Sequence, residues 1–176
     1  MTKDEILNAS ITIIAHDGYD KLTLSQLSNE LKVKKSSIYY YFNSKDEIIS
    51  SLYLNAKKIL SKFTFNVDFS HSSLEILQSV FSHWEKIYQD KVFSLYLSLL
   101  EQRYMVDEEA YEIKTSLDLM IEAQSDAVIE NLIERKKLNY QNKKLLSFLF
   151  SSAAKECLKR EESEGFILQF DSFFSH

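Results

Sequence analysis

The sequence contains no proline and only two glycines, Gly18 and Gly165, among 176 residues. Sheets and hairpins need such residues at their turns, so this scarcity predicts an almost entirely helical chain. The single cysteine, Cys157, excludes an intramolecular disulfide and a cysteine metal cluster. Apolar runs fall short of the roughly 20 residues that a membrane span needs, and the start MTKDEILNAS lacks the features of a signal peptide. We therefore expect a cytoplasmic protein without a membrane partner.

Arginine does not occur among the first hundred residues, and the formal net charge is −5. The basic residues are nevertheless concentrated, because residues 32–62 contain seven lysines against Asp46 and Glu47, a local balance of 7 − 2 = +5. Phosphate contacts depend on local charge, so a basic patch on an acidic chain is compatible with DNA binding. A solvated lysine-rich face would give the same pattern, and charge alone does not separate these two interpretations.

The segment from Thr23 to Ile48 has the spacing of two very short helices joined by a tight turn. Thr23, followed three residues later by Gln26, predicts a helix start, and Lys32 lies in the turn. Two such short helices bury little by themselves, so their arrangement favours presenting the second one to a partner, as in the DNA major groove. The helices expected in this part cover about residues 3–16, 24–31, 35–42 and 45–63.

The third of these expected helices has one apolar and one polar face. Ile38 and Phe42, four residues apart, are expected to point inward. The opposite surface then carries Lys35, Ser36, Tyr39 and Tyr40. Lysine and serine suit base edges and phosphates, and tyrosine offers a hydroxyl to phosphate and a ring face to thymine methyl groups. The alternative interpretation is a packed aromatic hinge without a nucleic-acid role.

These segments resemble the DNA-binding head of the TetR family of transcriptional regulators. The resemblance covers about residues 5–50 and rests on ILNAS…II…GYDKLTLSQLSNEL, VKKSSIYYYF and NSKDEI. It implies an all-α homodimeric repressor, in which a three-helix head is joined by a fourth helix to a helical ligand-binding and dimerisation body. The DNA-contacting residues that it implies are Thr23, Ser25, Lys34, Lys35, Ser36, Ser37, Tyr39, Tyr40, Tyr41 and Lys45. The family usually has glycine where this chain has Lys32, so we expect that lysine to adopt a positive φ.

We expect the helix-turn-helix head to occupy residues 1–46 and the effector-binding and dimerisation body to occupy residues 47–176. Residues 64–71 break the helical period and are expected to connect two parts of the chain. Helices over about 115–137 and 141–160 are expected to pair with their symmetry mates as a four-helix bundle. Four phenylalanines near the end of the chain are expected to share one helix face: Phe166, Phe170, Phe173 and Phe174.

The expected body is rich in aromatic residues, several of which could line a cavity for a small hydrophobic or aromatic ligand. The candidates are Phe81, Trp84, Tyr88, Tyr96, Arg103 and Tyr104. An ordinary helical core, with Arg103 at the surface, explains the same residues. We expect a bound ligand to shift the fourth helix and so lower the affinity for DNA. Control by a protein partner instead of a small molecule is the alternative.

The sequence lacks the Gly-rich phosphate loops, nucleophile motifs and metal-ligand spacings of enzymes. We therefore expect no enzymatic activity, no cofactor and no metal. The expected partner is double-stranded DNA with a palindromic operator, because two heads of a dimer read successive major grooves roughly 34–36 Å apart. Arginine–guanine contacts cannot form from a head without arginine, so we expect an A·T-rich operator, read through tyrosine–thymine contacts and DNA shape.

Overall fold

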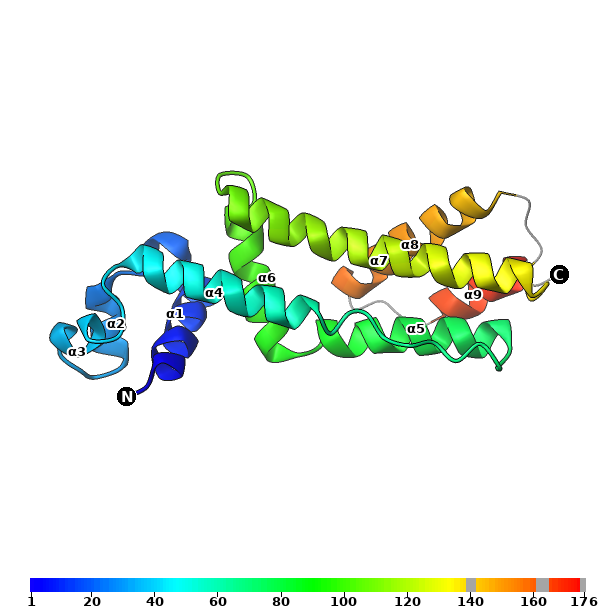
Figure 1. Ribbon diagram of the computed structural model, residues 1–176. Helices are drawn as coiled ribbons and strands as arrows, with labels where there is room; N and C mark the ends of the chain where they lie inside the picture. The colour runs from blue at the N-terminus through cyan, green and yellow to red at the C-terminus, as the bar shows by residue number, and fades with distance from the viewer. Residues whose placement is uncertain (139–141, 161–164, 175–176) are drawn as a thin grey trace. The chain divides into compact units, whose positions relative to one another are not determined.

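The computed structural model describes residues 1–138, 142–160 and 165–174, and every regular element in these ranges is a helix (Figure 1). The helices are α1 (Lys3–Asp17), the 3-10 turn η1 (Tyr19–Lys21), α2 (Leu24–Glu30), α3 (Lys35–Tyr39), α4 (Lys45–Leu60), α5 (Ser73–Tyr88), α6 (Lys91–Arg103), α7 (Glu108–Glu134), α8 (Lys143–Arg160) and α9 (Phe166–Phe174). The expected all-α fold is confirmed. Within the described ranges, the helices are too short or too polar to cross a membrane.

The chain packs as two compact units. The first unit comprises residues 1–61 and 91–115, and the second comprises residues 62–90 and 116–176. The first unit therefore contains α1 to α4, α6 and the start of α7. The second contains α5, the rest of α7, α8 and α9. This is a division by packing, and the functional boundary expected between residues 46 and 47 stays a prediction.

Polar side chains begin the helices of the first unit where the sequence predicts them. The Thr23 hydroxyl accepts a hydrogen bond from the Gln26 amide at 3.0 Å, which satisfies one of the free amides at the start of α2. The Ser44 hydroxyl does the same for the Glu47 amide at 3.2 Å and begins α4. Gly18 ends α1 with φ +101°, a backbone conformation that residues with a Cβ rarely adopt.

The core of the first unit is built from the inward faces of its short helices. Ile38 of α3 and Phe42 just after it are fully buried, as expected. The helix itself is shorter than expected, since it ends at Tyr39 and the chain turns through residues 40–42. α6 packs along α1 and against α4, and the bond from Gln102 of α6 to Ile14 of α1 spans 88 residues of the chain.

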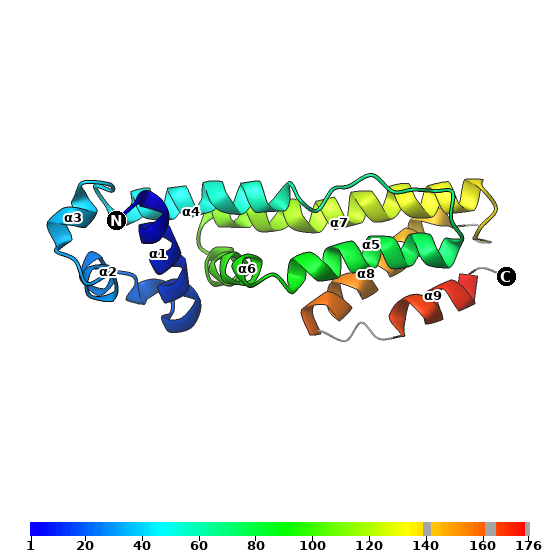
Figure 2. The same ribbon diagram turned by 90° about the horizontal axis from the view of Figure 1, so that it is seen from below.

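The second unit is organised around α5, which packs against α8 and α9. Before α5, residues 62–72 form no helix, as the broken period predicts, and this segment is called the strap here. Its residues 64–68 have no regular structure, and turns lie at residues 61–62 and 69–70. The strap and α5 run in opposite directions (Figure 2). Phe150 of α8 joins the aromatic core, with its ring centre 6.1 Å from that of Trp84 and 5.0 Å from that of Phe170.

Further boundary expectations and one packing expectation need correction. α4 ends at Leu60 rather than near residue 63. α7 ends at Glu134 rather than near residue 137, because the chain turns into a positive φ at Lys136. α8 begins at Lys143, and residue 141, its expected start, lies outside the described residues. Phe173 does not share the buried face of Phe170, since it is 79% exposed. Three residues along a helix rotate a side chain by about 60° from the starting direction, which places Phe173 at the edge of that face.

Candidate nucleic-acid interface

The turn between α2 and α3 sets the direction of the candidate recognition helix. Lys32 has φ +55°, which confirms the expected positive φ. Its amide donates to the Asn29 carbonyl at 3.1 Å, and the Val33 amide donates to the Ser28 carbonyl at 3.0 Å. These two bonds form the Schellman pattern, in which a left-handed residue ends a helix and satisfies its last carbonyls. The chain is thereby reversed and the start of α3 is fixed.

α3 presents a polar and aromatic surface over its buried Ile38. Tyr39 is 52% exposed and Tyr40 is 82% exposed, and Lys35 and Ser36 before them are exposed as well. Large aromatic side chains are seldom left this exposed without a role, because they expose apolar area to water. The four residues expected to lie on the outer surface of this helix therefore do so together.

The candidate DNA-contacting residues around α3 differ in the exposure of their side chains and in the hydrogen bonds that they already make. Thr23, Ser25 and Lys34 are exposed, and Ser37 is half-buried. The Thr23 hydroxyl already accepts the Gln26 amide, so it offers a phosphate only its own proton. Lys34 precedes α3 in an extended conformation and caps it without a side-chain bond. Lys34 and Lys35 thus place two exposed ammonium groups at the start of the candidate recognition helix.

Two of the candidate DNA-contacting side chains, Tyr41 and Lys45, form hydrogen bonds within the protein. The Tyr41 hydroxyl donates to the Met1 carbonyl at 2.6 Å. The Lys45 ammonium donates to the Tyr19 carbonyl at 2.9 Å and lies 4.0 Å from the centre of the Tyr19 ring. Burial lowers the pKa of the Lys45 ammonium. In this structure both side chains hold the head together, and their contact with phosphates stays a prediction.

Tyr19 and Gln102 form a long-range hydrogen-bonded contact that the sequence analysis did not predict. The Tyr19 amide donates to Gln102 Oε1 at 2.8 Å, and Gln102 Nε2 donates to the Ile14 carbonyl at 2.9 Å. The guanidinium of Arg103 lies 4.1 Å from the centre of the Tyr19 ring, on which the Lys45 ammonium also lies. One glutamine therefore connects α6 to the end of α1 and to the turn that follows. The partners are 83 and 88 residues apart, so a local pattern gives no signal of them.

The six candidate ligand-binding residues are divided between the two units. Phe81, Trp84 and Tyr88 belong to the second unit, and Tyr96, Arg103 and Tyr104 belong to the first. Trp84 is fully buried, and Arg103 pairs with Asp107 at 3.4 Å. Their role in ligand binding stays a prediction.

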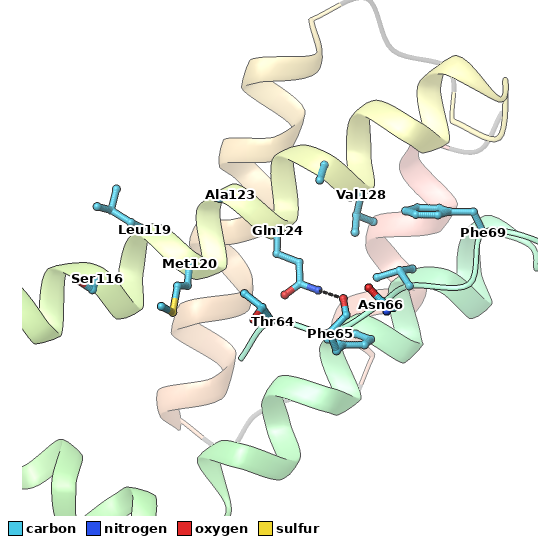
Figure 3. A pocket seen from close by; sticks show the side chains of 12 residues that line it. Thr64, Phe65, Asn66, Phe69, Ser116, Leu119, Met120, Ala123, Gln124 and Val128 are labelled. Carbon is cyan, nitrogen blue, oxygen red and sulfur yellow. Dashed lines mark hydrogen bonds between the residues drawn. The ribbon is translucent and has the colours of Figure 1, made fainter. Parts of the chain in front are cut away.

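A different part of the second unit contains an open groove, between the strap and α7 (Figure 3). Its volume is about 830 Å³, which lies within the range of small-molecule sites. The residues that line it are Thr64, Phe65, Asn66, Val67, Phe69, Ser116, Leu119, Met120, Ala123, Gln124, Ala127 and Val128. The sequence analysis did not name these residues. The alternation of Phe65, Val67 and Phe69 is the signal that could have indicated this wall, because alternate residues of a non-helical segment share one face.

The sequence of the head matches a known family. Residues 6–52 match the family described as bacterial regulatory proteins, tetR family. The biofilm operon icaADBC HTH-type negative transcriptional regulator IcaR of Staphylococcus epidermidis is 34% identical over 67 residues, which cover 38% of this chain and 33% of that protein. Its counterpart from Staphylococcus aureus is 41% identical over 46 residues, 26% of this chain and 25% of that protein. The chain thus matches a third or less of the length of these relatives.

Solved structures resemble the chain over nearly its whole length. The ketosteroid transcriptional regulator KstR2 of Mycobacterium tuberculosis has a TM-score of 0.72 at 13% identity, covering 99% of this chain and 95% of its own. A regulatory protein of the tetR family from Rhodococcus RHA1 has a TM-score of 0.67 at 14% identity, covering 97% and 93%. Fold and head together define an all-helical protein with a helix-turn-helix. By sequence the head, residues 6–52, matches the tetR family, and over nearly its whole length the chain has the fold of the solved regulators just described.

Proposed function

We propose that this protein is a sequence-specific DNA-binding repressor that acts in the cytoplasm. The observation that carries the proposal is the exposed surface of α3, where Tyr39 and Tyr40 lie beside Lys35 above a buried Ile38. Lysines supply phosphate contacts and tyrosines supply both hydroxyl and ring contacts, so this surface suits a major groove. Repression is supported by the relatives named IcaR, which are negative transcriptional regulators.

The proposed repressor is a homodimer that binds a palindromic operator. One head reaches only a few base pairs, whereas two heads reading successive turns multiply the contacts. The side of α8 that carries Leu145, Phe148 and Leu149 supports a dimer, because all three are exposed and their spacing puts them on one helix face. Phe148 is the most exposed of the three, at 63%.

Release from the operator is proposed to follow the binding of a small molecule. The groove between the strap and α7 supports this, since it is concave, mostly apolar and of suitable volume. A difference of about 1–3 kcal/mol between the ligand affinities of the DNA-binding and released states would lower operator affinity about five- to 150-fold.

A selection of random DNA duplexes by the purified protein, at two salt concentrations, tests the DNA-binding proposal. We expect an enriched A·T-rich palindrome with half-sites about one helical turn apart. Affinity should fall steeply as salt rises, because phosphate contacts release counterions. Binding without any enriched sequence from a folded dimer would contradict the proposal.

Control by a protein partner is a second candidate. The exposed apolar side chains of α9, Leu168 and Phe173, favour it, because apolar groups at a surface can be covered by a partner. Replacing both with serine should leave operator affinity and its response to small molecules unchanged if the regulator is ligand-controlled. Loss of regulation in the cell, with intact operator binding by the purified variant, would favour the partner.

A further inference from the structure

The walls of the groove in the second unit carry no charged side chain among the described residues. Among its twelve lining residues none is acidic or basic, and the polar ones are Thr64, Asn66, Ser116 and Gln124. An ionised ligand would leave its hydration shell without gaining an opposite charge, which is strongly unfavourable. The walls therefore favour a neutral molecule with a large apolar surface.

Gln124 supplies a second, independent observation. Its Nε2 donates to the Phe65 carbonyl at 3.2 Å and so ties the middle of the strap to α7 (Figure 3). Its Oε1 is buried and has no hydrogen-bond partner among the described residues. A buried acceptor left without a donor is a destabilising feature that a ligand can relieve. The missing group is a hydrogen-bond donor.

The strap is held at further points on both sides of Phe65, whose carbonyl accepts the Gln124 bond. Before it, His83 Nε2 lies 2.8 Å from the Lys62 carbonyl, and the His83 ring lies 4.0 Å from the ring of Phe65, centre to centre. After it, the Lys137 ammonium donates to the Phe69 carbonyl at 3.0 Å. The strap begins directly after α4 in the chain.

We propose that this groove binds an uncharged, predominantly apolar molecule whose hydroxyl donates a hydrogen bond to Gln124 Oε1. Gln124 Oε1 is buried, so the hydroxyl reaches it only when the Gln124 side chain or the neighbouring strap moves. The proposal names the ligand class of the regulator proposed above, and it rests on that function only for the consequence at the operator. A long-chain alcohol has the required chemistry and serves as the probe.

The three methionines make the binding visible in the intact chain. Met120 lines the groove, whereas Met1 and Met105 are exposed elsewhere. In protein labelled with ¹³C at the methionine methyl groups, 1-decanol should shift the Met120 resonance saturably and leave the other two in place. Met120→Leu assigns the resonance. This measurement contains no DNA, so its result does not depend on whether the operator selection succeeds. Conversely, a Met120 resonance that does not shift would contradict the ligand proposal without affecting the proposal of operator binding.

Two matched compounds test the chemistry of the ligand. Decyl methyl ether keeps the apolar chain without the donor, and we expect it to bind about five- to tenfold more weakly than 1-decanol. Decanoate carries a charge, and we expect it to bind at least about tenfold more weakly. Equal binding of the ether and the alcohol, or tighter binding of decanoate, would overturn the proposal.

Two variants test the site. Gln124→Leu should bring the affinities of 1-decanol and the ether within about twofold of each other, because it removes the acceptor. Ala127→Trp places a bulky group at an exposed position of the groove wall and should abolish the Met120 shift. Ser82→Trp, at an exposed α5 position outside the groove, is the matched control and should bind normally. A Met120 shift that survives Ala127→Trp would refute the site.

A helix of a second copy is the competing occupant of the groove. In that case the Met120 resonance would depend on protein concentration, and Ala127→Trp would change the oligomeric state measured by sedimentation. Either result would overturn the small-molecule proposal. We expect both quantities to be unchanged.

Discussion

The positive φ of Lys32 gives a stability prediction that can be worked out from the structure. A residue with a Cβ pays about 1–2 kcal/mol to enter the left-handed region, whereas glycine enters it freely but loses about 0.4–1 kcal/mol more backbone entropy on folding. The difference favours Lys32→Gly by roughly 1 kcal/mol. The two hydrogen bonds of the turn, from the Lys32 and Val33 amides, are retained because both come from the backbone.

Chemical denaturation followed by circular dichroism measures this gain, and Lys32→Ala is its control. Alanine removes the charge and the side chain but keeps the left-handed strain, so only the comparison of glycine with alanine isolates φ. A gain of about 1 kcal/mol also corresponds to about 2–4 °C in the melting temperature of a chain of this size. Glycine no more stable than alanine would refute the reasoning.

The same glycine substitution can be tested at a second lysine with a positive φ, Lys136 in the second unit. It also has φ +55°, and it ends α7 with the same pair of bonds, Lys136 amide to Ile133 carbonyl and Lys137 amide to Leu132 carbonyl. Lys136→Gly should therefore stabilise the chain by a similar amount. A gain at one turn without a gain at the other would show that side-chain contacts outweigh the backbone term.

Two further predictions concern the DNA interface, and a third concerns the stability of the first unit. Tyr39→Phe should weaken one operator position by about 1–3 kcal/mol, measured by binding to a set of single-base operator variants; uniform weakening would contradict base readout. Lys34→Ala should weaken all sequences about equally and reduce the salt slope by about one unit, measured by titrations over a salt series, and a sequence-dependent loss would contradict phosphate contact. Gln102→Ala should lower the free energy of unfolding by about 1–2 kcal/mol through its lost bonds to Tyr19 and Ile14, and an unchanged denaturation midpoint would contradict it.

The local features of the head could be predicted from sequence because each depends on a few neighbouring residues. The capping by Thr23 and Ser44 and the inward pair Ile38 and Phe42 are of this kind, whereas the positive φ of Lys32 was expected from the family resemblance. Helix periodicity and capping chemistry operate over three or four residues, so a single sequence contains their signal.

The contacts that were missed join distant parts of the chain. Lys45 could be placed at a helix start, yet its partner, Tyr19, lies 26 residues earlier. The groove requires Gln124 to meet Phe65 across 59 residues. The non-helical strap could be predicted from its broken period, but not the helix against which it packs. Long-range pairing is set by the whole fold, and one sequence without relatives does not reveal it.

The functional boundary and the packing boundary of this chain therefore need not coincide. Residues 1–46 carry every candidate DNA contact, but the carbonyl of Ile14 and the amide of Tyr19 obtain partners from Gln102 of α6. α6 also covers α1, whose Ile6 and Ile14 are fully buried. A head cut off after residue 61 would lose these contacts and expose apolar surface, at about 25 cal/mol for each Å² uncovered. The recognition surface is consequently a property of the first unit as a whole, and its operator affinity has to be measured on the full chain.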